Sequence, residues 1–322
     1  MILSITPNPL LERRLTFKSI KVGGVNRSKS ETFYAGGKGI NVSRQLNRLG
    51  IKNTSLTFLG GQNGKLLRRT LENESIDFLA VNTKSETRYA AVTIDEKQRQ
   101  LTSYFSPNSE ISDKEIDDFI AKMRNAILSS SMVVFAGSCP THNAEIIFTE
   151  GIKLAHENDK PVFIDTYGEH LNNCIELSPF ALHNNKKEIE KYFDAELNCE
   201  EDYLELLTKL YDKDIKMVFI TDGENPVFSS KFDFHYKISP PRVNAINSLG
   251  SGDAFVGGII YGLEQALVYE DFLKLAVALG SLNAEHYDAA NIIMSDAEKI
   301  VPDIDVQPIG KKMKLIDDSP NY

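Results

Sequence analysis

The run Gly250-Ser251-Gly252-Asp253 combines residue types that could hold an anion and accept a proton. It stands just before an apolar segment, residues 254–267, that has helical spacing. The first amides of a helix have no partner inside it, and glycine lets the backbone approach an anion closely. A carboxylate beside an anion suits a base that takes a proton from an attacking hydroxyl. The run therefore indicates phosphoryl transfer with Asp253 as the base, and the alternative is an ordinary helix start after a glycine-rich turn.

A second glycine-rich block, Gly36-Gly37-Lys38-Gly39-Ile40-Asn41, opens another segment with helical spacing. Its glycines would let the backbone touch sugar hydroxyls, Lys38 offers a charge to a phosphate, and Asn41 can both donate and accept hydrogen bonds. Ser138 ends an apolar strand, which is where open α/β sheets bind ligands. The alternatives are a solvated loop lysine for Lys38 and a helix cap for Ser138. The candidate substrate ligands from these two stretches are Gly36, Gly37, Lys38, Asn41 and Ser138.

Two further stretches could serve a nucleotide and its metal. Asn185 and Glu188 are three residues apart and would share one face of a predicted helix. Thr221-Asp222-Gly223 directly follows a predicted buried strand. The alternatives are a solvated helix face and a plain turn. There is no G-x-x-x-x-G-K-[ST] motif, and Pro7-Asn8-Pro9 stands where a dehydrogenase needs G-x-G-x-x-G, so both of those classes are unsupported.

The elements that must position these residues alternate between apolar strands and helices. This pattern predicts an α/β fold with a mainly parallel central sheet covered on both faces. The alternating segments in the first hundred residues do not fit it and predict a small separate sheet, a candidate lid. The predicted strands of the large sheet are 1–6, 54–59, 132–137, 161–165, 180–183 and 217–221, and those of the small sheet lie in 15–22, 30–34, 88–95 and 100–105. The predicted helices are 40–50, 65–74, 112–128, 144–157, 168–174, 187–193, 202–212 and 254–267.

Composition narrows the class of protein. The chain has 322 residues, with 42% hydrophobic and 25% charged residues, as in soluble globular proteins. A net charge of −9 argues against a general binder of nucleic acid or of anionic membranes. There is no signal-peptide pattern and no apolar run that could span a bilayer. The three cysteines have neither metal-ligand spacing nor a disulfide framework, so we expect a cytoplasmic protein.

Asn8-Pro9, the glycine–lysine block, Asn185-Lys186-Lys187-Glu188 and Gly250-Ser251-Gly252-Asp253 occur in an order that resembles the PfkB (ribokinase-like) family of sugar kinases. The resemblance covers residues 1 to about 289 and looks closest to the branch of 1-phosphofructokinase and tagatose-6-phosphate kinase. It implies a ribokinase-like three-layer α/β/α sandwich with a small β-sheet lid. The expected organisation is one kinase domain over 1–308, a lid built from segments within about 8–36 and 86–106, and a polar tail over 309–322.

The resemblance also implies roles for individual residues. It assigns the sugar to the position of Glu12 and to the glycine–lysine block, and the phosphate of a phosphosugar to Lys38 and Arg88, with an exposed strand residue as the alternative for Arg88. Asn185 and Glu188 would organise Mg²⁺ through water, with Thr221 and Gly223 against the nucleotide. The implied reaction transfers phosphate from ATP to a phosphorylated ketohexose such as fructose 1-phosphate or tagatose 6-phosphate. A homodimer formed through the lid is a further expectation.

The sequence departs from the family pattern in two further stretches besides an extra proline in Thr6-Pro7-Asn8-Pro9. Glu12 stands where the family usually has an aspartate, and His183-Asn184-Asn185 replaces Lys-Pro-Asn. The extra methylene of Glu12 could displace a sugar hydroxyl and so change which sugar fits. The competing hypothesis is a weak or inactive regulatory protein that binds a nucleotide or phosphosugar on the same scaffold. Turnover of any sugar or sugar phosphate with Mg-ATP at an ordinary enzymatic rate would exclude it.

Overall fold

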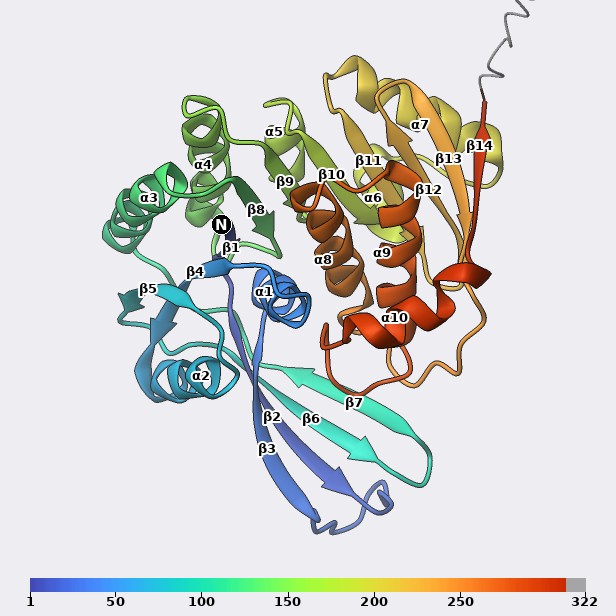
Figure 1. Ribbon diagram of the computed structural model, residues 1–322. Coiled ribbons are helices and arrows are strands. Elements are labelled where there is room, and N and C mark those ends of the chain that lie inside the picture. The colour runs from blue at the N-terminus through green and yellow to red at the C-terminus, as the bar shows by residue number, and fades with distance from the viewer. Residues whose placement is uncertain (311–322) are drawn as a thin grey trace, which may run out of the picture.

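The computed structural model describes residues 1–310, whose strands form one large and one small sheet (Figure 1). Neighbouring strands of the large sheet run parallel, except for three that are added antiparallel at one edge. In spatial order the strands are β14 (Asp305–Ile309), β13 (Phe234–Ser239), β12 (Asn225–Lys231), β11 (Met217–Asp222), β10 (Ala181–Asn185), β9 (Val162–Asp165), β8 (Met132–Ala136), β1 (Ile2–Thr6), β4 (Asn53–Gly60) and β5 (Phe78–Thr83). The predicted mainly parallel sheet is confirmed.

Helices cover both faces of this sheet and complete three layers (Figure 1). They are α1 (Lys38–Arg48), α2 (Gly61–Asn73), α3 (Asp113–Leu128), α4 (Ile146–His156), α5 (Leu171–Ile175), α6 (Lys186–Phe193), α7 (Glu200–Asp212), α8 (Ser251–Glu264), α9 (Tyr269–Asn283) and α10 (Met294–Ile300), with short 3₁₀ turns η1 (His142–Glu145) and η2 (Val301–Asp303). In β9, Val162 and Ile164 pack with α3 to α7 on one face, and Phe163 packs with α1, α8, α9 and α10 on the other. The strands are apolar on both sides because both sides are buried.

The small sheet projects from the body of the molecule (Figure 1). Its strands, in spatial order, are β3 (Ser30–Gly36), β2 (Leu10–Phe17), β6 (Tyr89–Asp95) and β7 (Gln100–Phe105). At its base, Leu11 and Ala35 pack against Ile40 of α1 and Leu67 of α2. The chain enters β2 directly after Pro9, so the base of the small sheet lies next to the end of β1.

Several elements differ from the sequence prediction. The strand expected over 15–22 is Leu10–Phe17, and the helix expected from 254 begins at Ser251. Strands β5, β12 and β14 and helices α9 and α10 had no prediction. The polar tail was expected from 309, but β14 continues through Ile309, and residues 311–322 lie outside the described part of the chain. None of the helices within residues 1–310 is long and apolar enough to cross a membrane.

Candidate active site

Helix α8 begins with amides that are free to bind an anion. Gly250 precedes it with a φ of 82°, and a side chain there would collide with Ala289, so this position requires glycine. The Ser251 amide donates to the carbonyl of Ser248 at 3.2 Å. Among the described residues, the amides of Gly252 and Asp253 donate to no acceptor. The turn at the start of α8 thus presents two unpaired amides, those of Gly252 and Asp253, whereas the Ser251 amide is engaged, and anion binding there stays a prediction.

The Asp253 carboxylate faces the interior, with 5% of the residue exposed. Its Oδ2 accepts a hydrogen bond of 2.7 Å from Asn41 Nδ2, which joins the start of α8 to the start of α1. Burial and the negative charge of Asp165 raise the pKa of Asp253 to about 6, against the opposing effects of Lys38 and Asn41. A carboxylate with this pKa is mostly ionised at neutral pH and can still take up a proton readily.

The glycine–lysine block turns the chain from β3 into α1. Gly37 has a φ of 119° and lies against Thr6 and Pro9, where a larger residue would not fit. The turn brings Lys38, the first residue of α1, over the carboxyl ends of the central strands. Its Nζ lies 2.9 Å from Asp165 Oδ1 and 3.6 Å from Glu188 Oε1. Lys38 thus connects the predicted sugar block with the predicted magnesium pair.

Asp165 is the central charged residue that the sequence prediction did not assign to the site. It ends β9, is fully buried, and contacts both Lys38 and His183 Nδ1, the latter at 3.0 Å. Burial alone would raise the pKa of Asp165, but the charge of Lys38 and the contact with His183 hold it below its ordinary value. Burial likewise opposes the charge of Lys38, yet the surrounding carboxylates raise its pKa. The available signal was an acid at the carboxyl end of an apolar strand.

His183 lies between Asp165 and Thr221 and beside the start of α8. Its Nε2 lies 3.2 Å from Thr221 Oγ1, and its Cε1 lies 3.1 Å from the point where a Cβ on Gly252 would stand. Thr221, His183, Asp165 and Lys38 therefore form a continuous series of polar contacts. Gly223 lies farther out, at an exposed turn between β11 and β12 with a φ of 58°.

Asn185 and Glu188 form a capping box at the start of α6. The Asn185 side chain accepts from the Glu188 amide at 2.9 Å, and Glu188 Oε2 accepts from the Asn185 amide at 3.1 Å. Glu188 Oε1 still faces Lys38. No group of three His, Cys, Asp or Glu side chains within residues 1–310 could hold a metal ion. The donor set nevertheless fits Mg²⁺ held by Glu188 and by water, because Mg²⁺ commonly keeps several of its waters.

Arg88 and Ser138 are brought together through Asn8. Arg88 donates to the carbonyls of Asn8 and Pro9 at 3.0 and 3.2 Å, and Asn8 Nδ2 donates to Ser138 Oγ at 3.0 Å. Burial lowers the pKa of Arg88. These contacts fix the turn between β1 and β2 and place both predicted residues beside it. Asn108, which the prediction missed, contacts both Asn8 and Arg88.

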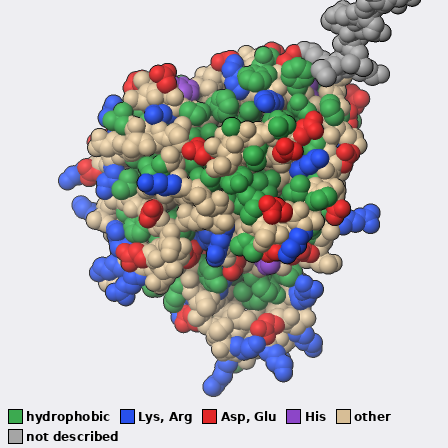
Figure 2. Space-filling model, viewed as in Figure 1, with side chains coloured by type: hydrophobic (Ala, Val, Ile, Leu, Met, Phe, Trp, Pro, Cys, Tyr) green, Lys and Arg blue, Asp and Glu red, His purple; other side chains and the backbone are tan. Residues whose placement is uncertain are grey.

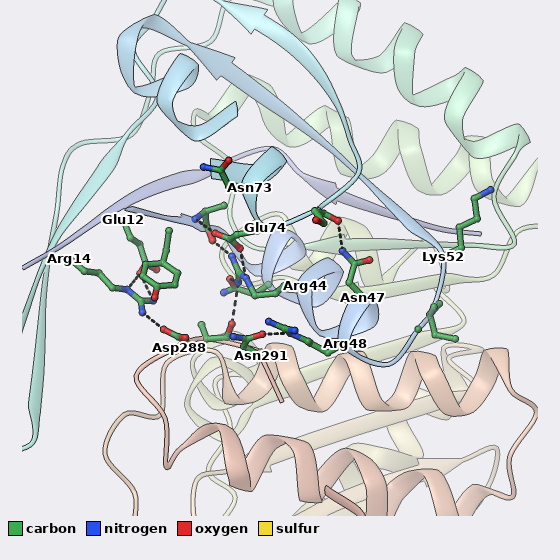
Figure 3. A pocket seen from close by; sticks show the side chains of 17 residues that line it. Glu12, Arg14, Arg44, Asn47, Arg48, Lys52, Asn73, Glu74, Asp288 and Asn291 are labelled. Atoms are coloured by element: carbon green, nitrogen blue, oxygen red, sulfur yellow. Dashed lines mark hydrogen bonds and ion pairs between the residues drawn. The ribbon is translucent and has the colours of Figure 1, made fainter. Parts of the chain in front are cut away.

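Glu12 lies on the small sheet, at one end of a cavity of about 770 Å³ (Figure 3). Asn41 also lines this cavity, and Glu12 Oε1 lies 3.1 Å from the point where a Cβ on Gly36 would stand. Arg44, which the prediction missed, donates to Asn41 Oδ1 at 2.7 Å and to Glu74 Oε2 at 2.6 Å. Of the predicted acceptor residues, Glu12 and Asn41 line this cavity, and Asn41 is hydrogen-bonded to Asp253.

Comparisons with known proteins identify the family of the chain. Residues 10–296 match the pfkB family of carbohydrate kinases. The chain belongs to this family. It transfers phosphate to a hydroxyl group, and the family uses ATP with a divalent metal. The predicted family resemblance and ribokinase-like fold are confirmed.

Individual relatives lie at moderate identity. The 1-phosphofructokinase of Borreliella burgdorferi is 29% identical over 285 residues, which cover 88% of this chain and 92% of the relative. The 1-phosphofructokinase of Bacillus subtilis is 28% identical over 284 residues, with 88% and 92% covered. Phosphofructokinase-2 from Escherichia coli in complex with fructose-6-phosphate is similar in structure, with a TM-score of 0.82 at 22% identity over 94% of this chain and 98% of that one. At this identity the last similarity shows the fold alone.

Proposed function

We propose that this carbohydrate kinase uses ATP and Mg²⁺ to phosphorylate a hydroxyl of a phosphorylated ketohexose, with fructose 1-phosphate and tagatose 6-phosphate as the leading acceptors. The observation that carries the proposal is the buried Asp253 carboxylate, hydrogen-bonded to Asn41 beside two unpaired amides at the start of α8. The curated relatives named 1-phosphofructokinase support a phosphosugar acceptor.

Asp253 is the base in the proposed reaction. The acceptor hydroxyl forms a bond to the γ-phosphorus, the bond from that phosphorus to the β–γ bridging oxygen breaks, and Asp253 takes the hydroxyl proton while ADP leaves. The amides of Gly252 and Asp253 hold charge on the transferred group. Glu188 would hold Mg²⁺ through water, and the ion would supply positive charge to the nucleotide phosphates.

Lys38 holds positive charge between the two substrates in this proposal. Its charge persists at neutral pH because Asp165, Glu188 and Asp253 raise its pKa. The small sheet carries Glu12 and closes the acceptor side, which keeps water away from the transferred phosphoryl group. We assign residues 1–309, through the end of β14, to one kinase domain with this sheet as its lid.

The small sheet is also the surface that we infer to form a homodimer. Its loop 18–29 exposes Val22 at 95% and Val25 at 94%, and β7 exposes Tyr104 at 61% and Phe105 at 57%. Figure 2 shows that lysine and arginine side chains gather on this projecting end of the molecule. Exposed apolar side chains on a small sheet favour burial against another surface, here a second copy of the chain. Light scattering on wild type and on a Val22→Asp, Val25→Asp variant tests this, with a monomeric wild type as the contradicting result.

An ADP-release assay tests the proposed activity. The panel contains fructose 1-phosphate, fructose 6-phosphate, tagatose 6-phosphate and the unphosphorylated sugars, each with Mg-ATP. We expect the highest kcat/KM with one of the phosphorylated ketohexoses. The proposal would be rejected if none of these acceptors raised ADP release above the ATPase background. Highest turnover with an unphosphorylated sugar would keep the kinase and reject the acceptor class.

A further inference from the structure

The cavity next to Asn41 has an arginine on its wall to which neither the motifs nor the comparisons give a role. Figure 3 shows Arg14 at the Glu12 end of the cavity, pointing between Glu12 and Asp288. Arg14 lies two residues after Glu12 in β2, so both side chains leave the strand on the same face. Asp288 comes from the loop that follows α9, on the opposite wall.

The three side chains form a buried ion cluster. Arg14 Nε and Nη2 lie 2.9 and 2.8 Å from one oxygen of Glu12, Oε2. Arg14 Nη1 lies 2.8 Å from Asp288 Oδ1, and the guanidinium carbon stands 3.9 Å from the centre of the Tyr34 ring. The side chains of Arg14 and Glu12 are only 4% and 5% exposed. Two donors on one oxygen and a ring against the guanidinium leave this arginine little freedom.

This arrangement makes the two oxygens of Glu12 unequal. Oε2 is taken by Arg14, whereas Oε1 lies over the backbone of Gly36 and has no hydrogen bond among the described residues. Oε1 is therefore the oxygen that can accept a hydrogen bond from a molecule in the cavity. A glutamate has one more rotatable bond than an aspartate, and the contact with Arg14 removes that extra freedom.

We propose that Arg14 is a positioning residue that sets acceptor specificity by fixing the Glu12 carboxylate, so that Oε1 alone receives an acceptor hydroxyl. The inference rests on the proposed function, since it assumes that a sugar occupies this cavity end. Asp288 anchors Arg14 from the opposite wall. Glu12 and Arg14 then act as one unit, and a change in either residue alone is expected to spoil the site.

The competing explanation is that Arg14 only attaches the small sheet to the loop after α9. Loss of a purely structural ion pair would lower the folding stability. It would change the KM for ATP and the KM for the acceptor equally, or change neither. A positioning role affects the acceptor KM and the ranking of acceptors while leaving the ATP KM unchanged. A double-mutant cycle with Glu12 separates the two explanations further.

The experiment measures kcat, both KM values and the acceptor ranking for wild type, Arg14→Gln, Arg14→Lys, Glu12→Asp and the Glu12→Asp, Arg14→Gln double variant. We expect Arg14→Gln to raise the acceptor KM about tenfold, the size of a lost charged hydrogen bond, with the ATP KM unchanged. Arg14→Lys keeps the charge but cannot place two donors on Oε2, so it should recover only part of the loss. The double variant should lose no more than the worse single variant.

A matched control lies one residue away. Arg13 is on the opposite face of β2, exposed, and paired with Glu31, so Arg13→Gln should leave both KM values unchanged. An unchanged acceptor KM and ranking in Arg14→Gln would overturn the proposal, as would equal losses for ATP and acceptor. If Arg14→Gln does not fold, Arg14→Lys decides by the same KM criteria.

The two proposals fail in different ways. Absence of turnover in wild type rejects the kinase function. In that case calorimetric binding of fructose 1-phosphate and tagatose 6-phosphate to wild type and to Arg14→Gln still tests Arg14. Weaker binding in the variant supports the positioning role, and equal binding or none to either protein rejects it.

Discussion

Glu12 and His183, which both depart from the family pattern, lie in differently built parts of the site. His183 lies on β10 of the large sheet, and its neighbours Asp165 and Thr221 come from the adjacent strands β9 and β11. Glu12 lies on the small sheet, and its ion cluster reaches across the cavity to a loop far away in the chain. The first group is positioned by backbone pairing of buried strands, whereas the second depends on its own side-chain contacts. The carboxyl ends of these central strands, with Lys38 and Asp253 beside them, are called the sheet-edge group below. We expect changes in this group to alter charge and chemistry, and changes at the cavity wall to alter how the acceptor fits.

The largest effect is expected where the sheet-edge charges act on the reaction. Asp253→Asn keeps the size of the side chain but cannot take the proton from the acceptor. We expect kcat to fall at least about 100-fold, with the acceptor KM little changed. Steady-state ADP release with the best acceptor measures this. A loss below about tenfold would show that Asp253 is not the general base.

The stability of the same variant is the control for its fold. The pKa of Asp253 in the folded protein, about 6, lies above the ordinary aspartate value, so folding disfavours the ionised form. The stabilising effect of this group is thus present at low pH and is lost as the pH rises through 6. Asp253→Asn should therefore raise the free energy of unfolding by about 3 kcal/mol at pH 8, and most of the gain should be absent at pH 4. Urea unfolding at the two pH values measures it.

Lys38→Met tests whether strand pairing alone keeps the sheet-edge group stably folded, without the charge of Lys38. Asp165 would remain fully buried without its cation, and breaking a buried pair costs about 3 kcal/mol. We expect that loss in unfolding free energy together with a fall of about 10- to 100-fold in kcat/KM. Lys153→Met, at an exposed pair with Glu150, is the control and should cost almost nothing. A stable, active Lys38→Met variant would contradict the central place given to Asp165.

The two regions also differ in what could be predicted from sequence. The glycine blocks and Asp253 were predicted because their signals are local: glycine at a positive φ and an acid in the first turn of a helix. The Lys38–Asp165 pair joins residues 127 positions apart, and only the sheet order brings them together. Strand alternation predicts that Arg14 and Glu12 lie on the same face of β2. No nearby residue in the sequence indicates that Asp288 lies opposite Arg14.

The central parallel strands of the large sheet were predicted better than its antiparallel edge strands, for a related reason. Apolar runs such as that of β8 identify buried parallel strands, whereas β12 contains the polar pair Ser229-Ser230 and looks like a loop. These serines are nevertheless buried, and the Tyr269 hydroxyl donates to the side chain of Ser229 and the carbonyl of Ser230. Such a contact depends on α9, which lies later in the chain and was itself not predicted.

A pH profile tests the charge of the sheet-edge group. Because Asp253 must be ionised to act as the base, we expect kcat/KM to fall as the pH drops below about 6. His183→Lys would place a permanent positive charge near Asp253 and so favour its ionised form. The acid limb should move down by about half a pH unit or more in this variant. His183→Gln, which stays neutral, is the control, and identical profiles for the two variants would show that charge at this position does not reach Asp253.

The smallest effect is expected at the outer end of the cavity-wall cluster. The Asp288 side chain is 37% exposed, and Arg14 keeps its two contacts with Glu12 without it. Because an ion pair with one partner in solvent contributes little, Asp288→Asn should raise the acceptor KM by only about twofold. It should do so more at low salt than at high salt, because screening already weakens the wild-type pair. The acceptor KM measured at two salt concentrations tests this, with Asp296→Asn as the control. An increase in KM as large as that of Arg14→Gln would mean that Asp288, rather than the contact between Arg14 and Glu12, fixes the Glu12 carboxylate.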